Sequence, residues 1–402
     1  MAIDPLELNQ LDLHAATATR RKKGMLFIAL ACSLLSFAMS IQSNSNANFV
    51  AREMNLSGRE QGTLESCRET CGIIALGILA ILAGLSEPII AAAMLALVGI
   101  GIGAYSFVPG YFWLIAASMV WSQGLHVWMP LPNSMTLSLS EPGQAGRRLG
   151  QIAAASSAGA ALALLAGWGL TRLDIPIRHL YLVGGAAAIL AGACCLGIPR
   201  DIKGIRPRLV FRKRYGMYYL MCFLEGWRKQ VSLAFAGFLL VRKFDIDLET
   251  MFGLGMAIQV SNWIAAPRVG RLIDRIGERG VLMTYFVGLA VFFTGYALIT
   301  NRIALCVLYV LDSSFFLLGM GLTTYVNRIV PKEEHTPTLS MGVAMNHVAA
   351  VSMPFIGGLI WASMGYQWVF LLGASAAAAS VFAAARLPKH VPSPSSPSPS
   401  QH

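Results

Sequence analysis

Charged residues are scarce in this chain: they make up 13% of its 402 residues, against about 25% in typical soluble proteins. Hydrophobic residues make up 55%, and the mean hydropathy is +0.60. This composition excludes an ordinary soluble domain and predicts a polytopic membrane protein. Cysteine is sparse too. All seven cysteines fall inside predicted spans, where we expect small apolar side chains and no disulfide framework.

Motifs for nucleotide-driven and catalytic chemistry are missing as well. The chain has no Gly-x-x-x-x-Gly-Lys-Ser/Thr loop, so nothing in it indicates direct coupling to ATP. It has no strong metal-ligand spacing and no nucleophile with an evident base, so we expect neither an enzyme nor a cofactor. The net charge of +11 would suggest nucleic acid in a soluble protein. Here the basic residues lie between apolar runs and indicate membrane topology instead.

Apolar runs of about 20 residues predict twelve transmembrane helices. They begin near residues 24, 58, 88, 110, 146, 179, 215, 249, 280, 303, 336 and 366. We therefore expect an all-α membrane protein with twelve transmembrane helices in two six-helix bundles. Most of the 31 Lys and Arg residues fall on the side of the N-terminus. The positive-inside rule then places both termini in the cytoplasm, and we expect a bacterial inner membrane.

Five segments are expected along the chain. Residues 1–23 form a cytoplasmic N-terminal segment, and its acidic residues argue against a cleaved signal peptide, so the first span should remain as an anchor. Residues 24–199 form the first bundle, the basic connection 200–214 is a cytoplasmic linker, and residues 215–387 form the second bundle. The Pro- and Ser-rich tail, residues 388–402, should be disordered.

Polar side chains are distributed unevenly among these spans. Spans three, six, nine and twelve carry almost none, whereas most of the other spans carry several. A helix that faces lipid tolerates few polar groups, and a helix that lines a pathway needs several. The pattern predicts three-helix units with every third helix on the outside. That arrangement is expected of secondary transporters built from repeated units, with a site near the midplane.

A short motif between spans eight and nine indicates a family. Residues 270–279 read GRLIDRIGER, which resembles the cytoplasmic loop motif of the major facilitator superfamily. The matching positions are Gly270, Arg271, Asp274, Arg275, Gly277 and Arg279. Segments 354–358 and 365–370 are also similar to many members, and the resemblance covers residues 20–388. It implies a twelve-helix transporter that works by alternating access, expected here to be a monomer.

Two stretches depart from that resemblance. Residues 84–88, between spans two and three, lack the loop motif, so a conformational lock of that type is not expected in the first half. Residues 150–169, in span five, lack the Gly-Pro stretch that resembles drug/proton antiporters, which lowers the weight of multidrug efflux.

Span seven places charge in the middle of an apolar segment. Glu225, Arg228 and Lys229 have the i, i+3, i+4 spacing that puts them on one helix face, near the midplane of a hydrocarbon core about 30 Å thick. Two cations beside one carboxylate leave a net positive site, which suits an anionic substrate with Arg228 as its clamp. The alternative is a self-neutralising triad that holds span seven against its neighbours.

Polar residues of other spans complete the expected site. Further candidates for substrate binding are Asn44, Asn48, Gln123, His126, Gln259 and Asn346, and candidates for proton coupling are Glu65, Glu69 and Asp312. Crowded, desolvated carboxylates are suited to carrying protons near neutral pH. Two alternatives stay open: a solvated outer helix end around Glu65 and Glu69, and a counter-ion role for Asp312 beside Arg228 or Lys229.

The expected function is secondary active transport of a small polar, anionic solute, with proton-coupled symport as one form of it. Its expected partners are the solute, protons and the lipid bilayer, with no nucleic acid and no bound metal. Three alternatives stay open. One is efflux of amphipathic compounds, and another is copper transport through soft ligands such as Met341, Met345 and His347. The third is a transporter-shaped receptor or scaffold that no longer transports.

Overall fold

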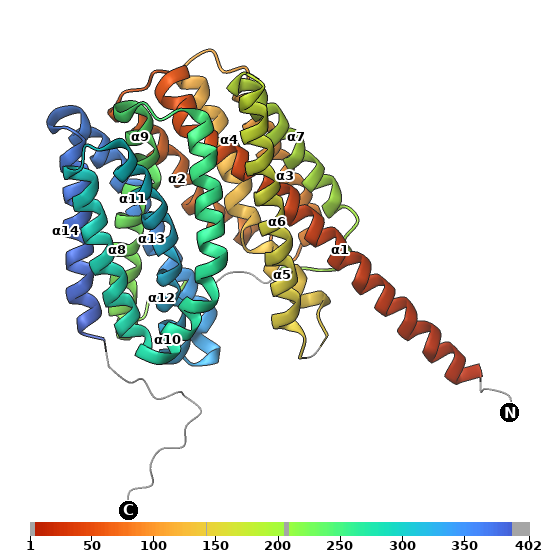
Figure 1. Cartoon of the computed structure of the whole chain (residues 1–402). Helices are drawn as coiled ribbons and strands as arrows, with labels where there is room; N and C mark the ends of the chain where they lie inside the picture. Colours follow the sequence, from red (N-terminus) through yellow and green to blue (C-terminus); the bar gives the residue numbers. More distant parts are fainter. Residues whose placement is uncertain (1–4, 142, 205–208, 388–402) are drawn as a thin grey trace, which may run out of the picture. The chain divides into compact units, whose positions relative to one another are not determined.

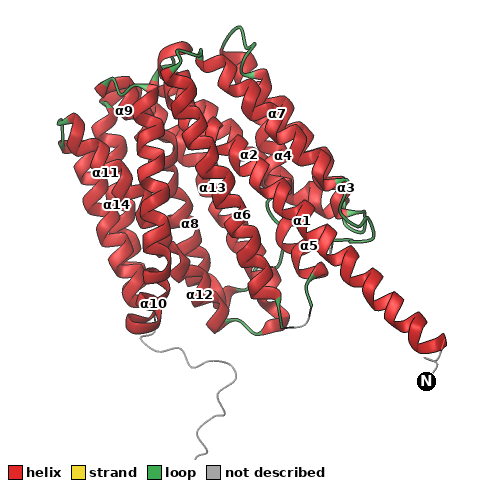
Figure 2. Ribbon diagram, turned by 45° about the vertical axis from the view of Figure 1, so that its right-hand side comes forward, coloured by secondary structure: helices red, strands yellow, loops and turns green. Residues whose placement is uncertain are grey.

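The computed structural model describes residues 5–141, 143–204 and 209–387, and these residues are almost entirely helical (Figures 1 and 2). Within the described ranges the only β contact is an isolated bridge between Ser86 and Lys203. Residue contacts divide the chain into two units, residues 1–45 with 74–206 and residues 46–73 with 207–402. The predicted tail, 388–402, lies outside the described residues, and the predicted domain boundaries stay predictions.

The N-terminal unit is helical, and its most extensive helix packing involves α3. Its elements are most of α1 (Pro5–Asn48), the end of α2 (Gly58–Ile81), α3 (Glu87–Ala104), α4 (Tyr111–Trp128), α5 (Leu131–Leu139), α6 (Ala145–Arg172) and α7 (Ile177–Cys195). Helix α3 packs against both α4 and α7. A Cβ atom added to Gly99 would lie 2.6 Å from the carbonyl oxygen of Gly185, and one added to Gly185 would lie 2.7 Å from that of Gly99. The close approach of α3 and α7 therefore requires glycine at both positions.

The C-terminal unit begins with the end of the first transmembrane pass. Its elements are η1 (Phe49–Glu53), the start of α2, η2 (Lys213–Tyr215), α8 (Gly216–Val231), η3 (Ser232–Ala236), α9 (Gly237–Phe244), α10 (Leu248–Leu298), α11 (Arg302–Phe315), η4 (Phe316–Gly319), α12 (Met320–Ile329), α13 (Lys332–Met364) and α14 (Tyr366–Ala385). Helix α8 packs against α13 and α14, and α10 packs against α11 and α14. The π-helical turn η3 joins α8 to α9 without a break in the helix.

The long element α10 is two transmembrane passes. Gly277 has φ 73° and ψ 166°, a conformation that lies outside the helical region and favours glycine. The chain reverses there, between a pass over residues 248–276 and a pass over residues 278–298. The second glycine of the loop motif thus forms the turn between spans eight and nine.

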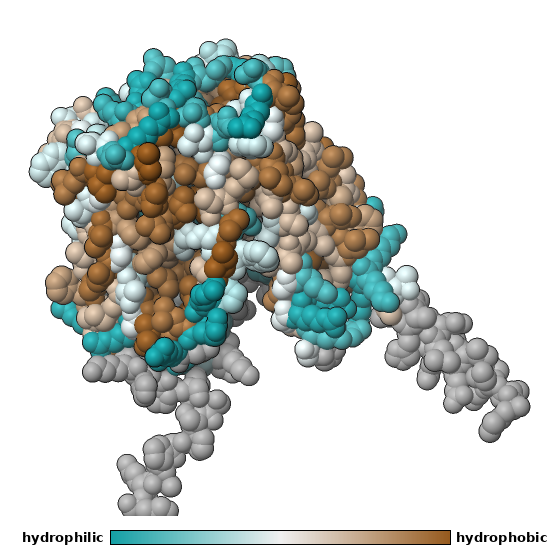
Figure 3. All heavy atoms as spheres, viewed as in Figure 1, coloured by the Kyte–Doolittle hydropathy of each residue, from teal (hydrophilic) through white to brown (hydrophobic). Residues whose placement is uncertain are grey.

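The predicted set of twelve spans is confirmed among the described residues. The observed helices begin close to the predicted positions, except that α1 begins at Pro5. Eight helical segments are long and apolar enough to cross a membrane. The four other passes, which carry polar or charged side chains, are α2, α4, the α8–η3–α9 helix and the first pass of α10. Within each unit, hydrophobic side chains cover the helix sides and hydrophilic ones gather at the helix ends (Figure 3). The chain is an integral, multi-pass membrane protein.

Candidate functional site

A fully buried arginine lies in the last turn of α8, near the middle of the continuous α8–η3–α9 helix. The side chain of Arg228 is 0% exposed, and its Nη2 donates to Oε2 of Glu225, one turn earlier on the same helix. The same nitrogen donates to the hydroxyl oxygen of Tyr285 on α10 at 2.7 Å. That hydroxyl in turn donates to Oε1 of Glu225 at 3.2 Å. Arginine, glutamate and tyrosine therefore form a closed hydrogen-bonded ring between α8 and α10.

Aromatic rings surround the guanidinium group of Arg228. Its Cζ lies 4.7 Å from the ring centre of Tyr285, 5.6 Å from that of Phe316 and 5.9 Å from that of Phe286. A desolvated cation over an aromatic face is stabilised by roughly 2 kcal/mol. Even so, Nε and Nη1 of Arg228 have no hydrogen-bond partner within the described part of the chain. Two buried donors therefore remain for another partner.

A second buried carboxylate lies on α11. Asp312 is 1% exposed, and its Oδ2 accepts a hydrogen bond from the Ser232 hydroxyl at 2.7 Å. The Tyr296 hydroxyl donates to the same oxygen at 3.5 Å. The other oxygen, Oδ1, has no hydrogen-bond partner among the described residues. Asp312 interacts electrostatically with Arg228, but the direct ion-pair partner of Arg228 is Glu225.

Lys229, the third charged residue of α8, has a different environment. It is half-buried, and no hydrogen-bond or ion-pair partner is found for it in the described ranges. Glu225 and Arg228 neutralise each other, so the net positive charge of this helix segment comes from Lys229. The structure thus separates the predicted triad into a compensated pair and a single cation.

A second polar cluster links α2 to α8. Glu65 is 1% exposed and pairs with Arg68, whose Nη1 donates to Oε1 at 3.0 Å. Gln61 donates to the same oxygen at 3.2 Å and to the carbonyl oxygen of Ala234, in η3, at 3.0 Å. Farther along α2, Oε2 of Glu69 lies 3.7 Å from Nδ1 of His347 on α13. Glu65 therefore lies in packed protein, and the alternative of a solvated helix end is wrong for it.

Comparisons with known proteins agree with this architecture. The family model described as Major Facilitator Superfamily matches residues 215–402. A crystal structure of the nucleoside transporter NupG superposes with a TM-score of 0.72 at 14% identity, covering 90% of this chain and 98% of that one. Residues 215–402 are thus similar to the major facilitator superfamily, and the chain as a whole shares the fold of its solved members. No curated protein matches the sequence.

Other solved members of the superfamily have the same fold. A D-xylose–proton symporter has a TM-score of 0.68 at 13% identity, covering 91% of this chain and 97% of its own. The human organic anion transporter MFSD10 has a TM-score of 0.59 at 12% identity, covering 90% and 99%. At these identities the likeness is one of fold, and the substrates of those proteins do not carry over by similarity.

The remaining predicted substrate residues are spread over both units of the chain. In the N-terminal unit, Asn44 donates to the Ser40 carbonyl at 2.8 Å, and His126 lies within hydrogen-bond distance of Ser122. In the same unit, Nε2 of Gln123 has no hydrogen-bond partner among the described residues.

In the C-terminal unit, Asn346 on α13 donates to the Cys222 carbonyl of α8 at 3.3 Å, which places it beside the charged face. Asn48 is buried at the end of α1, and Gln259 is half-buried on the first pass of α10. Asn346 is thus the predicted substrate residue that the structure brings directly to α8.

The loop motif combines a turn with two tethers. After Gly277, the Arg279 guanidinium donates to the carbonyl oxygen of Leu387 at 3.2 Å. The buried carboxylate of Glu278 pairs with Arg328 of α12 at 2.8 Å. Arg271 donates to the Pro267 carbonyl at 3.4 Å, and Arg275 is exposed. The burial of Gly270 and the side chain of Asp274 lie outside the described structure.

Sequence patterns missed several residues that complete these clusters. Tyr285 and Tyr296 lie on the second pass of α10, which was predicted to face outward, yet both are fully buried. That expectation is wrong for these two side chains because a helix can expose one face to lipid and turn a polar ring inward. The only available signal was the presence of two tyrosines 11 positions apart, about three helical turns, in an otherwise apolar span.

Proposed function

We propose that this protein is a secondary active transporter that moves a small polar anion by alternating access, coupled to protons as a symporter. The observation that supports an anionic substrate is Lys229, a half-buried cation in the middle of a transmembrane helix with no partner in the described part of the chain. Charge at that depth is unfavourable unless it is paired. An anionic solute supplies the missing partner.

Arg228 contributes to this site in a different way from the clamp predicted from sequence. In the conformation described here, aromatic rings and Glu225 enclose it. Its two remaining donors, Nε and Nη1, become available to a solute only when the surrounding helices move. We therefore assign first contact with the anion to Lys229, with Asn346 of the adjoining helix α13 as a second ligand, and a later contact to Arg228.

Proton coupling is assigned to Asp312, with Glu65 and Glu69 as a second group. Asp312 is buried and has one oxygen without a hydrogen-bond partner among the described residues. Removing a carboxylate from water is expensive unless it is paired or neutralised. Binding of a proton at Oδ1 would remove that charge and weaken the electrostatic attraction between Asp312 and Arg228. We further propose a monomer in a bacterial inner membrane with both termini in the cytoplasm.

A thermal-shift experiment on purified protein tests the substrate class. The probes are succinate, citrate and inorganic phosphate as anions, glucose and uridine as neutral solutes, and tetraphenylphosphonium as an amphipathic cation. A ligand present at 100 times its Kd stabilises the folded state by about 2.7 kcal/mol. We expect an anion to raise the Tm of the wild type and of the control Lys243→Gln, an exposed lysine of α9, but not of Lys229→Gln.

Two results would contradict this proposal. Stabilisation of all three proteins by a neutral solute would remove the role of Lys229, and stabilisation by the amphipathic cation would favour efflux. Proton coupling is measured separately in liposomes, where anion uptake should acidify the lumen. Asp312→Asn should abolish that acidification while the anion still raises the Tm.

A further inference from the structure

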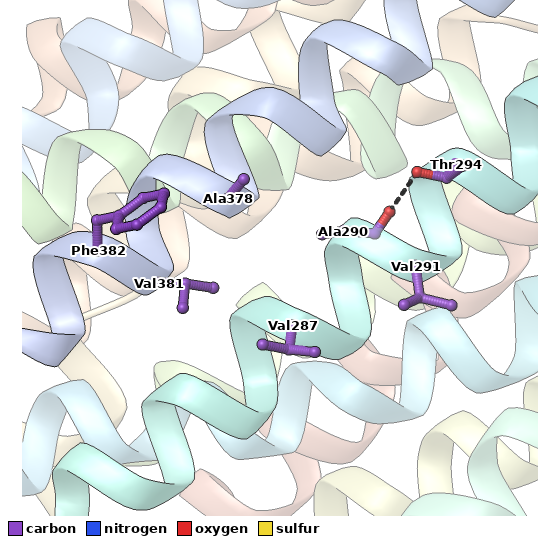
Figure 4. Close-up of a pocket in the computed structure, with 7 residues that line it drawn as sticks. All are labelled: Val287, Ala290, Val291, Thr294, Ala378, Val381 and Phe382. Carbon is purple, nitrogen blue, oxygen red and sulfur yellow. Dashed lines mark hydrogen bonds between the residues drawn. The ribbon is translucent and has the colours of Figure 1, made fainter.

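A membrane-facing groove lies between the second pass of α10 and α14 (Figure 4). Its volume is about 480 Å³, and it is lined on one side by Val287, Ala290 and Val291 and on the other by Ala378 and Phe382. Both helices belong to segments that are long and apolar enough to span a membrane, Arg275–Leu298 and Tyr366–Ala385. The groove is therefore open to the hydrocarbon region of the bilayer.

The lining of the groove is chemically apolar throughout. Its one hydroxyl group, that of Thr294, donates to the carbonyl oxygen of Ala290 at 2.8 Å, as the dashed line in Figure 4 shows. Val291 and Phe382 are 62% and 71% exposed. No unsatisfied donor or acceptor is thus available in the lining for a polar ligand, and a hydrocarbon chain fits the groove.

Arginines lie at one end of the same helix pair. The Arg279 guanidinium donates to the carbonyl oxygen of Leu387 at 3.2 Å, which holds the start of the second α10 pass against the end of α14. Arg386, next to Leu387, is exposed. With a rise of about 1.5 Å per residue, Phe382 lies roughly 6 Å from Arg386 and Val287 roughly 12 Å from Arg279 along their helices. Both distances are shorter than the depth of one bilayer leaflet, about 15 Å. A lipid whose chain lies in the groove could therefore reach Arg279 and Arg386 with its headgroup.

Among the described side chains, no acidic neighbour cancels this positive end. The nearest acid in sequence, Glu278, is buried and paired with Arg328 at 2.8 Å. Arg275, near the end of the first pass of α10, is exposed as well. An apolar groove below a basic surface is complementary to an anionic phospholipid. The phosphate of such a lipid would lie at the basic surface and its acyl chain in the groove.

We propose that the groove between α10 and α14 is a specific binding site for an anionic phospholipid. One acyl chain lies against Val287, Ala378 and Phe382, and the phosphate is held by Arg386 together with Arg279. The basic ends place the site in the cytoplasmic leaflet, which is the leaflet that carries anionic lipid. This site is separate from the proposed transport site on α8, so its test does not depend on the transported solute.

Native mass spectrometry of the full-length protein in detergent tests the site. The probes are dipalmitoyl phosphatidylglycerol, dipalmitoyl phosphatidylcholine with the same chains, and glycerophosphoglycerol as the headgroup alone. We expect the anionic lipid to bind more tightly than the zwitterionic one, and the headgroup alone to bind weakly. Arg386→Gln should weaken phosphatidylglycerol binding about fivefold, the effect of one basic residue at a membrane surface, and leave phosphatidylcholine unchanged.

Matched variants separate the groove from the rest of the lipid-facing surface. Ala378→Trp fills the groove and should displace both lipids, whereas Ala379→Trp places the same side chain at the adjacent exposed position of α14 and should not. Arg147→Gln, an exposed arginine of the other unit, is the control for charge. Equal lipid binding by the two tryptophan variants would overturn the proposal. So would equal affinity for the two lipids, or binding of the headgroup alone as strongly as the lipid.

Discussion

Removing either partner of the buried ion pair on α8 should destabilise the protein. The exposure of the remaining partner predicts which of the two variants loses more stability. Arg228→Met leaves Glu225 without its partner, but the Glu225 side chain is 17% exposed and retains some solvent contact. Glu225→Gln instead leaves a guanidinium that is 0% exposed without a carboxylate hydrogen-bonded to it. Because a fully buried unpaired charge is the worse case, we expect Glu225→Gln to be the more destabilising of the two.

The expected magnitudes follow from the contacts of the ring. Breaking a buried ion pair by removing one partner costs about 3–5 kcal/mol. We place Arg228→Met at about 3 kcal/mol, including the lost hydrogen bond to Tyr285, and Glu225→Gln at about 5 kcal/mol. In the double variant no unpaired charge remains. Its destabilisation should therefore fall about 3 kcal/mol short of the sum of the single variants.

Thermal unfolding in detergent, followed by size-exclusion chromatography, measures these differences. For a unit of 150–250 residues, 1 kcal/mol shifts the Tm by roughly 2–4 °C, so Arg228→Met should lower it by roughly 6–12 °C. Additive effects in the double variant would refute the ring as an energetic unit. A Glu225→Gln variant as stable as the wild type would show that Asp312 serves as the effective counter-ion of Arg228.

Two further predictions concern packing and pH. A Cβ atom at Gly62 would lie 2.7 Å from the Cα of Gly358 on α13, so Gly62→Ala should lower stability by about 1–3 kcal/mol; Gly77→Ala, on the same helix with open space around it, should not lower the Tm. Arg214 holds the pKa of Glu334 below its usual value. The stabilisation from this pair is therefore present above the unfolded pKa, about 4.3, and is lost as pH falls through the lower folded value. The Tm difference between wild type and Glu334→Gln should shrink below about pH 4.3 in a pH series, and a difference that grows there would contradict the assignment.

Local sequence patterns were enough to predict the spans and the pairing on α8. The hydrocarbon core requires about 20 apolar residues per pass, so the positions of the helices follow from hydropathy. Glu225 and Arg228 are one turn apart, and their ion pair follows from helix geometry alone. The same reasoning could not separate Lys229 from its neighbours, because the three residues lie close together on one face and only the packing of other helices decides which is covered.

Contacts between distant segments escaped prediction for a physical reason. Tyr285 is 57 residues from Arg228, and Ser232 is 80 residues from Asp312. Which side chains meet across such separations depends on the rotation of each helix about its axis, which hydropathy does not specify in a span that is apolar on most faces. The turn at Gly277 was anticipated only as part of a loop motif, and its backbone conformation explains why glycine is needed there.

The two groups of proposed proton-binding residues attach to the same short segment, η3. Gln61 holds Glu65 and also donates to the Ala234 carbonyl, and Ser232 donates to Asp312. A π-helical turn shifts the backbone hydrogen-bond register by one residue, which leaves a carbonyl such as that of Ala234 available to a side chain. The geometry thus connects a carboxylate on α2 to one on α11 through the backbone of the helix that carries Arg228 and Lys229.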